Sequence, residues 1–220
     1  FTVAHTWRAT RGHQLVTKLR YGRYERDLRA STIRLAPAAQ QPGGVAASLA
    51  TFGPSTAFTR GTQLKIPDMD TLYAQSDYSA RFDAWGLGHE LQAGVDLARE
   101  RKRVFAARNA AQGGIVPLKP TTTAGTPDDG AWIDESVRRL RRSSAYESLA
   151  GGLYVQDLIE LRPAWKLLLG LRHDRLAGDY DTYAIPANAP QPVTATRYRM
   201  RVAELSKRAG LLYQPNERVS

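Results

Sequence analysis

The segment WKLLLGLRHD, from Trp165 to Asp174, alternates two kinds of side chain with a period of two. Every second residue from Trp165 is apolar or carries a ring, whereas the residues between them mix charge, glycine and a single leucine. Successive side chains of a β-strand point to opposite faces, but those on one face of an α-helix recur every three or four positions. The pattern therefore predicts a strand with one apolar face and one polar face.

The same alternation appears in five other segments, at 14–27, 71–83, 89–100, 146–161 and 206–215. In the third of them, for example, His89 and Leu91 begin an apolar face. Asp157 interrupts the apolar face of the fourth. Proline cannot donate a hydrogen bond to a sheet ladder, and no proline lies inside these segments except Pro215, which ends the last one. The chain is therefore predicted to be all-β.

The connections between these segments alternate in length. Short connections lie near 9–13, 83–88 and 161–165, and long ones lie near 35–61, 107–143 and 185–195. Loops of the longer kind are uncommon in compact soluble domains, but a transmembrane β-barrel has short turns at one rim and long loops at the other. Trp7, Trp85 and Trp165 lie beside the short turns, as an aromatic girdle at a membrane interface requires. The segments are therefore interpreted as strands of a transmembrane barrel.

In such a barrel the apolar face meets lipid and the polar face lines a wet lumen. His89 and His173 fall on the apolar face, where they are expected to be interfacial rings rather than metal ligands. Charged side chains on the polar face are expected to pair across the wall or to contact a plug, and the upper ones to attract anionic ligands. The charges expected to face the lumen are Lys18, Arg20, Arg81, Asp96, Arg172, Asp174 and Arg208.

A soluble antiparallel sandwich with one polar face shows the same period. With a net charge of +10, it would be a basic, β-rich binding module for an anionic polymer or ligand. Detergent dependence separates the two architectures, because a barrel segment exposes edge strands and an apolar face. The positive charge is spread along the chain, which disfavours nucleic acid. The exception is RRLRR at 138–142, which is expected to contact lipopolysaccharide phosphates.

Patterns typical of catalytic and metal-binding sites do not occur in the sequence. There is no cysteine, the four histidines lack metal-ligand spacing, and HELQA at 89–93 lacks the second histidine of a zinc-protease helix. There is also no G-x-S-x-G elbow. No apolar run predicts a transmembrane helix, and the opening FTVAHTWRAT is not a signal peptide. The chain is therefore expected to be a fragment of a longer protein, with no enzymatic activity and no resident cofactor.

Four stretches of the chain carry a resemblance to a known family: LRYGRYERD (19–27), SDYSARFDAWGLGHELQAGVD (76–96), LYVQDLIELRPAWKLLLGLRHD (153–174) and RAGLLYQP (208–215). In their order and spacing they resemble the barrel region of TonB-dependent siderophore receptors of the bacterial outer membrane. The resemblance implies an antiparallel up-and-down meander of about seven long strands, an incomplete segment of a barrel of about 22 strands. Residues 1–220 are thus expected to be a partial barrel domain without a plug domain or signal peptide.

The resemblance also implies a function: a segment of a multi-pass outer-membrane receptor for TonB-dependent uptake of ferric siderophores, with the chelate as cargo. The implied partners are the ferric siderophore and outer-membrane lipid and lipopolysaccharide, with TonB and a plug domain in the full-length protein; nucleic acid is not among them. Tyrosine and arginine side chains near the long-loop end suit flat, anionic, catechol-like ligands. The residues expected to bind such a ligand are Tyr180, Tyr183, Arg197 and Tyr198.

Overall fold

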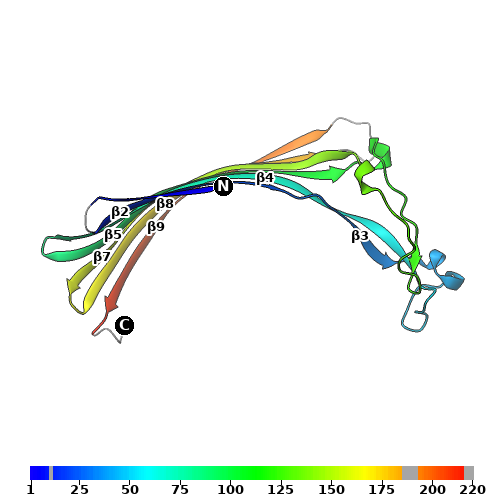
Figure 1. The fold of residues 1–220 in the computed structure, drawn as a ribbon, viewed down its shortest axis with the longest axis horizontal. Helices are drawn as coiled ribbons and strands as arrows, with labels where there is room; N and C mark the ends of the chain where they lie inside the picture. Colours follow the sequence, from blue (N-terminus) through cyan, green and yellow to red (C-terminus); the bar gives the residue numbers. More distant parts are fainter. Residues whose placement is uncertain (10–11, 185–192, 216–220) are drawn as a thin grey trace.

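The chain forms one open, curved antiparallel sheet (Figure 1) in the computed structural model, which describes residues 1–9, 12–184 and 193–215. The strands are β1 (Thr2–Arg8), β2 (His13–Glu25), β3 (Leu28–Leu35), β4 (Ala57–Ala84), β5 (Leu87–Ala107), β6 (Thr122–Thr123), β7 (Leu140–Arg162), β8 (Trp165–Ala184) and β9 (Thr194–Tyr213). Short 3₁₀ turns in the long connections are η1 (Ala38–Gln40), η2 (Pro42–Gly44), η3 (Ala110–Gln112) and η4 (Glu135–Val137). Within the described residues, no helix has the length and apolar character needed to cross a membrane.

The long strands follow one another across the sheet in the order β1-β2-β4-β5-β7-β8-β9, and every pairing is antiparallel. The short strands β3 and β6 both pair with β4, beyond the point where β2 ends. The predicted all-β meander of about seven long strands is therefore confirmed. β1 and β9 are its two edges, and each has one row of backbone groups without a strand partner in the described sheet.

β4 is joined to β5, and β7 to β8, at one end of the sheet, on the left in Figure 1, where β1 also ends and β2 begins. Between β4 and β5 the chain reverses through Trp85 and Gly86, which have φ values of 52° and 74°. Two successive positive φ values give a two-residue type I′ turn, whose twist matches that of the flanking strands. Two residues also separate β7 from β8. The predicted short connections at 83–88 and 161–165 thus lie at one end, as the alternation of loop lengths required, whereas the prediction near 9–13 falls partly on residues 10–11, outside the described residues.

The strands extend further toward the long-connection end than the sequence indicated. The segment 57–61, expected in a loop, belongs to β4, which is 28 residues long. β4 contains Pro67, whose carbonyl oxygen accepts the backbone N–H of Arg26 at 3.0 Å. In an antiparallel strand the nitrogen and oxygen of one residue point to the same side. The missing N–H of Pro67 therefore faces the junction between β2 and β3, where the ladder is already interrupted, and the proline is tolerated.

A β-bulge interrupts the ladder between β5 and β7 near the long-connection end. Val104 pairs with Ser144, but Phe105 pairs with Arg142, so Ser143 is an extra residue on β7. The Ser143 hydroxyl lies 3.0 Å from the Val104 carbonyl oxygen, to which it donates. A bulge of this kind bends the strand and changes which side chains share a face above it. As a result, Arg142 lies on the same face as Phe105.

The long connection 108–139 is tied to the β3–β4 hairpin, which bends away from the other strands on the right of Figure 1. Glu135 pairs with Lys119 at 2.6 Å and also with Arg138. The Lys119 ammonium also donates to the Ser31 hydroxyl at 3.0 Å, and Arg138 donates to the Thr62 hydroxyl at 2.8 Å. These charged side chains are largely buried, so each requires its partners to offset the loss of hydration. The segment and the hairpin therefore form one ordered unit.

The pairing register divides the side chains of β2, β4, β5, β7, β8 and β9 into two continuous faces. The apolar face includes the row Leu15, Tyr78, Ala93, Val155, Leu171 and Lys207. The polar face includes the row Lys18, Gln75, Asp96, Gly152, Asp174 and Glu204. Many large side chains of the apolar face are exposed; Leu153 is 64% accessible and Leu211 is 61% accessible. A contiguous apolar surface of this extent is typical of a face that another apolar medium or partner covers.

The apolar face changes character over successive rows near the long connections. The upper mixed row is Tyr21, Leu72, Arg99, Leu149, Ala177 and Arg201, and Arg175 lies one row below it on β8. The next row toward the long connections consists entirely of charged residues: Arg23, Asp70, Arg101, Glu147, Asp179 and Arg199. Leu167 and Ala177 lie near the two limits of the apolar region on β8. Their separation along the strand is about 33 Å, which is about 25 Å of height at the usual strand tilt of a membrane barrel.

We expect the anchoring of segment 108–139 to depend on the charge of Glu135. Hydrogen bonds from Arg138 and Lys119 hold the pKa of Glu135 below its ordinary value, and Arg138 has the larger effect. The stabilisation is therefore complete above the ordinary carboxyl pKa of about 4.3 and disappears as the pH falls through the lower folded value. Glu135→Gln should loosen the segment at pH 7 by about 3 kcal/mol. Amide hydrogen exchange over residues 119–138 measures this directly.

Asp128→Asn is the matched control for Glu135→Gln, because the Asp128 carboxylate lies in the same segment and, among the described residues, accepts the backbone N–H of Gly130 at 2.9 Å and forms no ion pair. It should leave the exchange of residues 119–138 unchanged. Equal protection in both variants at pH 7 would show that the ion pairs of Glu135 do not hold the segment in place.

Candidate functional site

The seven charged residues predicted to face a lumen all lie on the polar face. Lys18, Asp96 and Asp174 share one cross-strand row, and Arg20 lies one row above them. Arg81 and Arg208 lie nearer the short turns. Several pair with neighbours on the wall, as was expected: Arg81 lies 3.6 Å from Glu90, and Arg208 donates to the Gln156 side chain at 3.4 Å. The polar face is thus a wall with internal charge pairing.

A charged cluster occupies the middle of the polar face. Arg172 donates to Asp174 on its own strand at 2.7 Å and to Asp96 on β5 at 3.0 Å. Its guanidinium carbon lies 5.8 Å from the centre of the Tyr154 ring, a cation–π distance. The Tyr154 hydroxyl donates in turn to Asp77 on β4 at 2.7 Å. The cluster therefore links β4, β5, β7 and β8 through side chains as well as through the backbone.

Two glycines make room for this cluster. A Cβ atom at Gly94 would lie 2.6 Å from the Tyr154 ring, and one at Gly152 would lie 2.5 Å from an oxygen of Asp96. Real Cβ contacts are not this short, so a side chain at either position would displace the cluster. Gly94 therefore leaves the space that the Tyr154 ring occupies on the wall.

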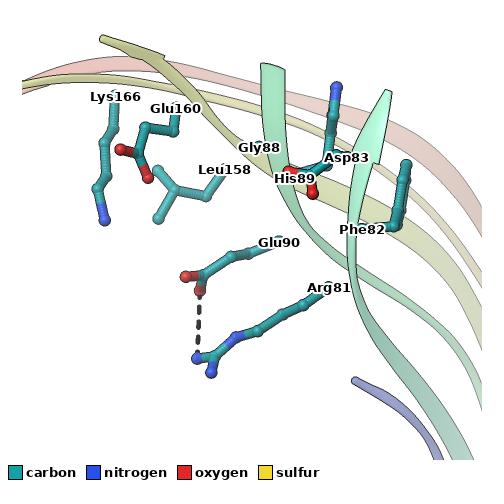
Figure 2. Close-up of a pocket in the computed structure, with 9 residues that line it drawn as sticks. All are labelled: Arg81, Phe82, Asp83, Gly88, His89, Glu90, Leu158, Glu160 and Lys166. Atoms are coloured by element: carbon teal, nitrogen blue, oxygen red, sulfur yellow. Dashed lines mark ion pairs between the residues drawn. The ribbon is translucent and has the colours of Figure 1, made fainter. Parts of the chain in front are cut away.

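A hollow lies on the polar face beside the short turns (Figure 2). Glu90, Arg81, Glu160 and Lys166 project into the same space, with Leu158 between them. The volume of the hollow is about 250 Å³. The only ion pair drawn there is Arg81–Glu90, and both of these side chains are substantially exposed. Exposed pairs of this kind contribute little to stability, so the hollow is an exposed charged surface rather than a preformed binding site.

A row of tyrosines crosses the polar face near the long connections. The row is Tyr24, Met69, Lys102, Tyr146, Tyr180 and Tyr198. The Tyr180 and Tyr198 rings lie 6.3 Å apart at an angle of 31°. Next to them is a hollow of about 490 Å³ lined by Met69, Glu100, Lys102, Val104, Ser144, Tyr146 and Tyr180. Aromatic rings, one ammonium group and a concave shape are the features by which proteins bind flat, partly charged small molecules.

The four residues predicted to bind ligand are divided between the two faces. Tyr180 and Tyr198 belong to the tyrosine row on the polar face. Tyr183 and Arg197 lie on the opposite face, since each is an odd number of positions away along its strand. Arg197 there makes two hydrogen bonds to Asp181, at 2.7 and 2.9 Å. The structure therefore brings together two of the four residues and adds Tyr24 and Tyr146, which the sequence analysis did not single out.

A buried polar pair on the apolar face was not foreseen by the sequence analysis. The His89 Nδ1 atom lies 2.6 Å from an Asp157 oxygen. The His89 ring stacks on Phe82 at 5.2 Å, and the Trp85 ring meets it edge-on at 6.0 Å. His89 is thus a buried, paired ring rather than a free interfacial one. The irregularity that Asp157 introduces into the sequence pattern is explained, because its register neighbour is Leu91 and its diagonal neighbour is His89.

Three arginines of the RRLRR segment (138–142) make three different kinds of contact. Arg138 is buried in the ion pairs of the 108–139 segment, so it is not available to an external phosphate. Arg141 donates to the Tyr183 carbonyl oxygen at 2.9 Å. Arg142 places its guanidinium 5.7 Å from the centre of the Tyr183 ring.

In the part of the chain that the structure describes, no group of three or more His, Asp or Glu side chains is arranged to hold a metal ion.

We expect Gly94→Ala to destabilise the sheet by about 1–3 kcal/mol, the usual effect of overpacking, because its methyl group would overlap the Tyr154 ring. Gly170→Ala is the control, since a Cβ there would have its nearest contacts at 3.6 Å, an ordinary van der Waals distance. Chemical unfolding of the detergent-solubilised full-length protein measures both. A Gly170→Ala protein as unstable as the Gly94→Ala protein would show that loss of glycine itself, not the position of the Tyr154 ring, sets the effect.

Comparison with known proteins agrees with this geometry. A family model described as TonB dependent receptor-like, beta-barrel, matches residues 1–220. No curated protein matches the sequence. The siderophore receptor PiuA from Acinetobacter baumannii superimposes with a TM-score of 0.63 at 16% identity, and the ferric citrate transporter FecA in its unliganded form with a TM-score of 0.54 at 14% identity. Identities this low establish likeness of fold.

The matched region is only part of each of these proteins. The similarity covers 98% of this chain in both cases, but 30% of the PiuA chain and 25% of the FecA chain. The chain thus corresponds to less than a third of the length of either structure.

Proposed function

The chain belongs to the family of TonB-dependent receptor β-barrels, and we propose that it forms part of the wall of an outer-membrane receptor that imports ferric siderophores. In this proposal the polar face lines the lumen and the apolar face meets lipid. The short turns lie at the periplasmic rim, and the tyrosine row lies just inside the extracellular mouth. The longer protein would supply a plug domain and the contact with TonB, and the ferric chelate would be cargo rather than a cofactor.

The observation that carries this proposal is the match between the apolar face and a bilayer. The apolar rows extend over about 25 Å, the height of the apolar band of an outer-membrane barrel. They begin beside Trp7, Trp85 and Trp165, at the short-turn end, and are bounded at the other end by one entirely charged row that crosses six strands. The Trp165 ring lies 4.5 Å from the Tyr213 ring on the neighbouring strand, as in an interfacial aromatic girdle. A soluble sandwich would need a second sheet to cover this face.

The tyrosine row supports the ligand class. The ferric complexes of catecholate siderophores are anionic and contain flat aromatic rings. The Tyr180 and Tyr198 rings offer stacking surfaces for such a ligand, and Lys102 lines the same hollow as Tyr180. These side chains lie on the side of the wall that an entering ligand would meet. Tyr183 and Arg197 lie outside the mouth in this orientation, so we assign ligand binding to Tyr180 and Tyr198. Nothing in the arrangement requires bond-breaking chemistry, and the proposed protein is a transporter rather than an enzyme.

The ligand proposal is tested by replacing Tyr180 and Tyr198 with leucine in the full-length receptor. Loss of both rings should weaken binding of a ferric catecholate siderophore about tenfold, which corresponds to about 1.4 kcal/mol. Fluorescence titration of purified receptor with ferric catecholate, hydroxamate and carboxylate chelates measures the change and identifies the preferred class. Tyr21→Leu, on the apolar face of β2, is the control and should bind normally. Unchanged affinity of the double variant for every chelate would contradict the assignment.

The membrane orientation is tested separately at Lys207, which interrupts the apolar face on β9. A lysine near the middle of the lipid-facing band costs about 2–4 kcal/mol, so Lys207→Leu should raise the unfolding free energy of the full-length receptor in lipid vesicles. Ser206→Leu, on the polar face of the same strand, should give no such gain. If Lys207→Leu leaves stability unchanged and Ser206→Leu raises it, the two faces have been assigned the wrong way round.

A further inference from the structure

We propose that Glu100 is a specificity-determining residue of this wall, and that it selects ferric chelates which carry a cationic arm beside the metal centre. The inference rests on the proposed function, in which the polar face lines the lumen and the tyrosine row meets the cargo. It goes further in two ways. It gives the cargo a charge pattern, and it assigns the recognition of that pattern to one side chain of β5.

Charge is scarce on the polar face around the tyrosine row. On strands β4, β5, β7, β8 and β9, the described rows between the Asp96 row and the row of Val104 and Ser144 contain mainly tyrosine, methionine, small and aliphatic side chains. Glu100 and Lys102 are the only charged residues in these rows. A single carboxylate or ammonium group therefore changes the local potential more here than it would on a crowded charged surface.

Glu100 and Lys102 are both exposed, and among the described residues neither forms an ion pair. Their sequence neighbours Arg99 and Arg101 lie on the opposite face, where Glu147 pairs with both at 2.6 and 3.0 Å. The charges on the outer side of this part of β5 are thus paired, and those on the polar face are not. Two positions of a strand span about 7 Å, so the carboxylate and the ammonium group can meet different parts of one ligand.

Both charges line the hollow of about 490 Å³ beside the tyrosine row, together with Tyr146 and Tyr180. A Cβ atom at Gly178 would lie 3.4 Å from the Tyr146 ring. Gly178 belongs to the same cross-strand row as Glu100, so the Tyr146 ring extends from its own row toward the row of Glu100. A carboxylate and aromatic rings thus border one concavity. This combination suits an organic cation, because the carboxylate and the face of an aromatic ring both attract positive charge.

The arrangement distinguishes chelates by where their charge lies. For a uniformly anionic chelate, the attraction of Lys102 and the repulsion of Glu100 oppose each other. A chelate with an ammonium or guanidinium arm satisfies both groups: the arm meets Glu100 and the Tyr146 ring, and the anionic metal centre meets Lys102 and the neighbouring rings. Specificity is a difference of affinities. Glu100 therefore contributes both by attracting the matching cargo and by repelling a cargo that lacks the arm.

The test uses two ferric catecholate chelates that differ in one group, which is a free amine on the scaffold of the first and its N-acetyl derivative in the second. The wild-type full-length receptor should bind the amine form about fivefold more tightly, as a partly exposed charge contact allows. Glu100→Gln should reduce this preference to less than about twofold, because it removes the charge and keeps the size of the side chain. Fluorescence titration of purified receptor in detergent measures both affinities.

Two further variants separate charge selection from general effects. Lys102→Gln should weaken binding of both chelates and retain the preference for the amine form. Glu160→Gln is the matched control, because it removes the same charge from the polar face near the short turns, well beyond the screening length of charges at physiological salt. It should leave the preference unchanged. A Glu100→Gln receptor that keeps the full preference, or a Glu160→Gln receptor that loses it, would overturn the inference.

The same pair of chelates is prepared with hydroxamate groups, so that the result does not depend on one kind of iron ligand. Uptake of radioactive iron from each chelate is measured in parallel. Binding and uptake of both forms with equal affinity in the wild-type receptor would refute charge selection and leave the transport proposal standing. Absence of both binding and uptake for every chelate would instead refute the transport proposal, and the assignment of Glu100 with it.

Discussion

The cross-strand register is the constraint on which the remaining features of this protein depend. Because side chains alternate strictly along each strand, one pairing such as Tyr78 with Ala93 determines the face of every other residue on β4 and β5. The same register then continues through β7 and β8. It collects leucines on one face, and Asp96, Arg172 and Asp174 on the other. A slip of a single residue would place the charged cluster in the apolar band.

The sequence was sufficient to predict the strands where one face is uniformly apolar. The segments around Leu91 and Leu169 alternate clearly, and the connections beside Trp85 and Trp165 were placed correctly. The lengths of the strands toward the long connections were underestimated, because both faces of the sheet are polar in that region. Arg101 and Lys102, for example, lie on opposite faces but both carry a positive charge. The β3–β4 hairpin was missed for the same reason.

Side-chain clusters were harder to predict than strands, because they depend on which strands are neighbours and in what register. Arg172 and Asp174 were placed on the polar face, but their partner Asp96 is distant in sequence. The tyrosine row shows the limit most clearly. Tyr180 and Tyr198 were singled out together with Arg197, although two adjacent residues of one strand must face opposite sides. The sequence pattern placed these residues at the correct end of the sheet, but it did not assign them to the correct face.

The bulge at Ser143 has a consequence for how such receptors diversify. Below it, even-numbered residues of β7 face the polar side; above it, Arg142 faces outward and Arg141 takes the other side. One inserted residue, fixed by a single hydroxyl contact to Val104, therefore inverts the sidedness of the strand tip while the wall below is left as it was. An insertion or deletion at the base of a long loop can thus exchange the side chains that face the cargo with those that face the surroundings of the receptor. It does so without substituting any of the residues above it.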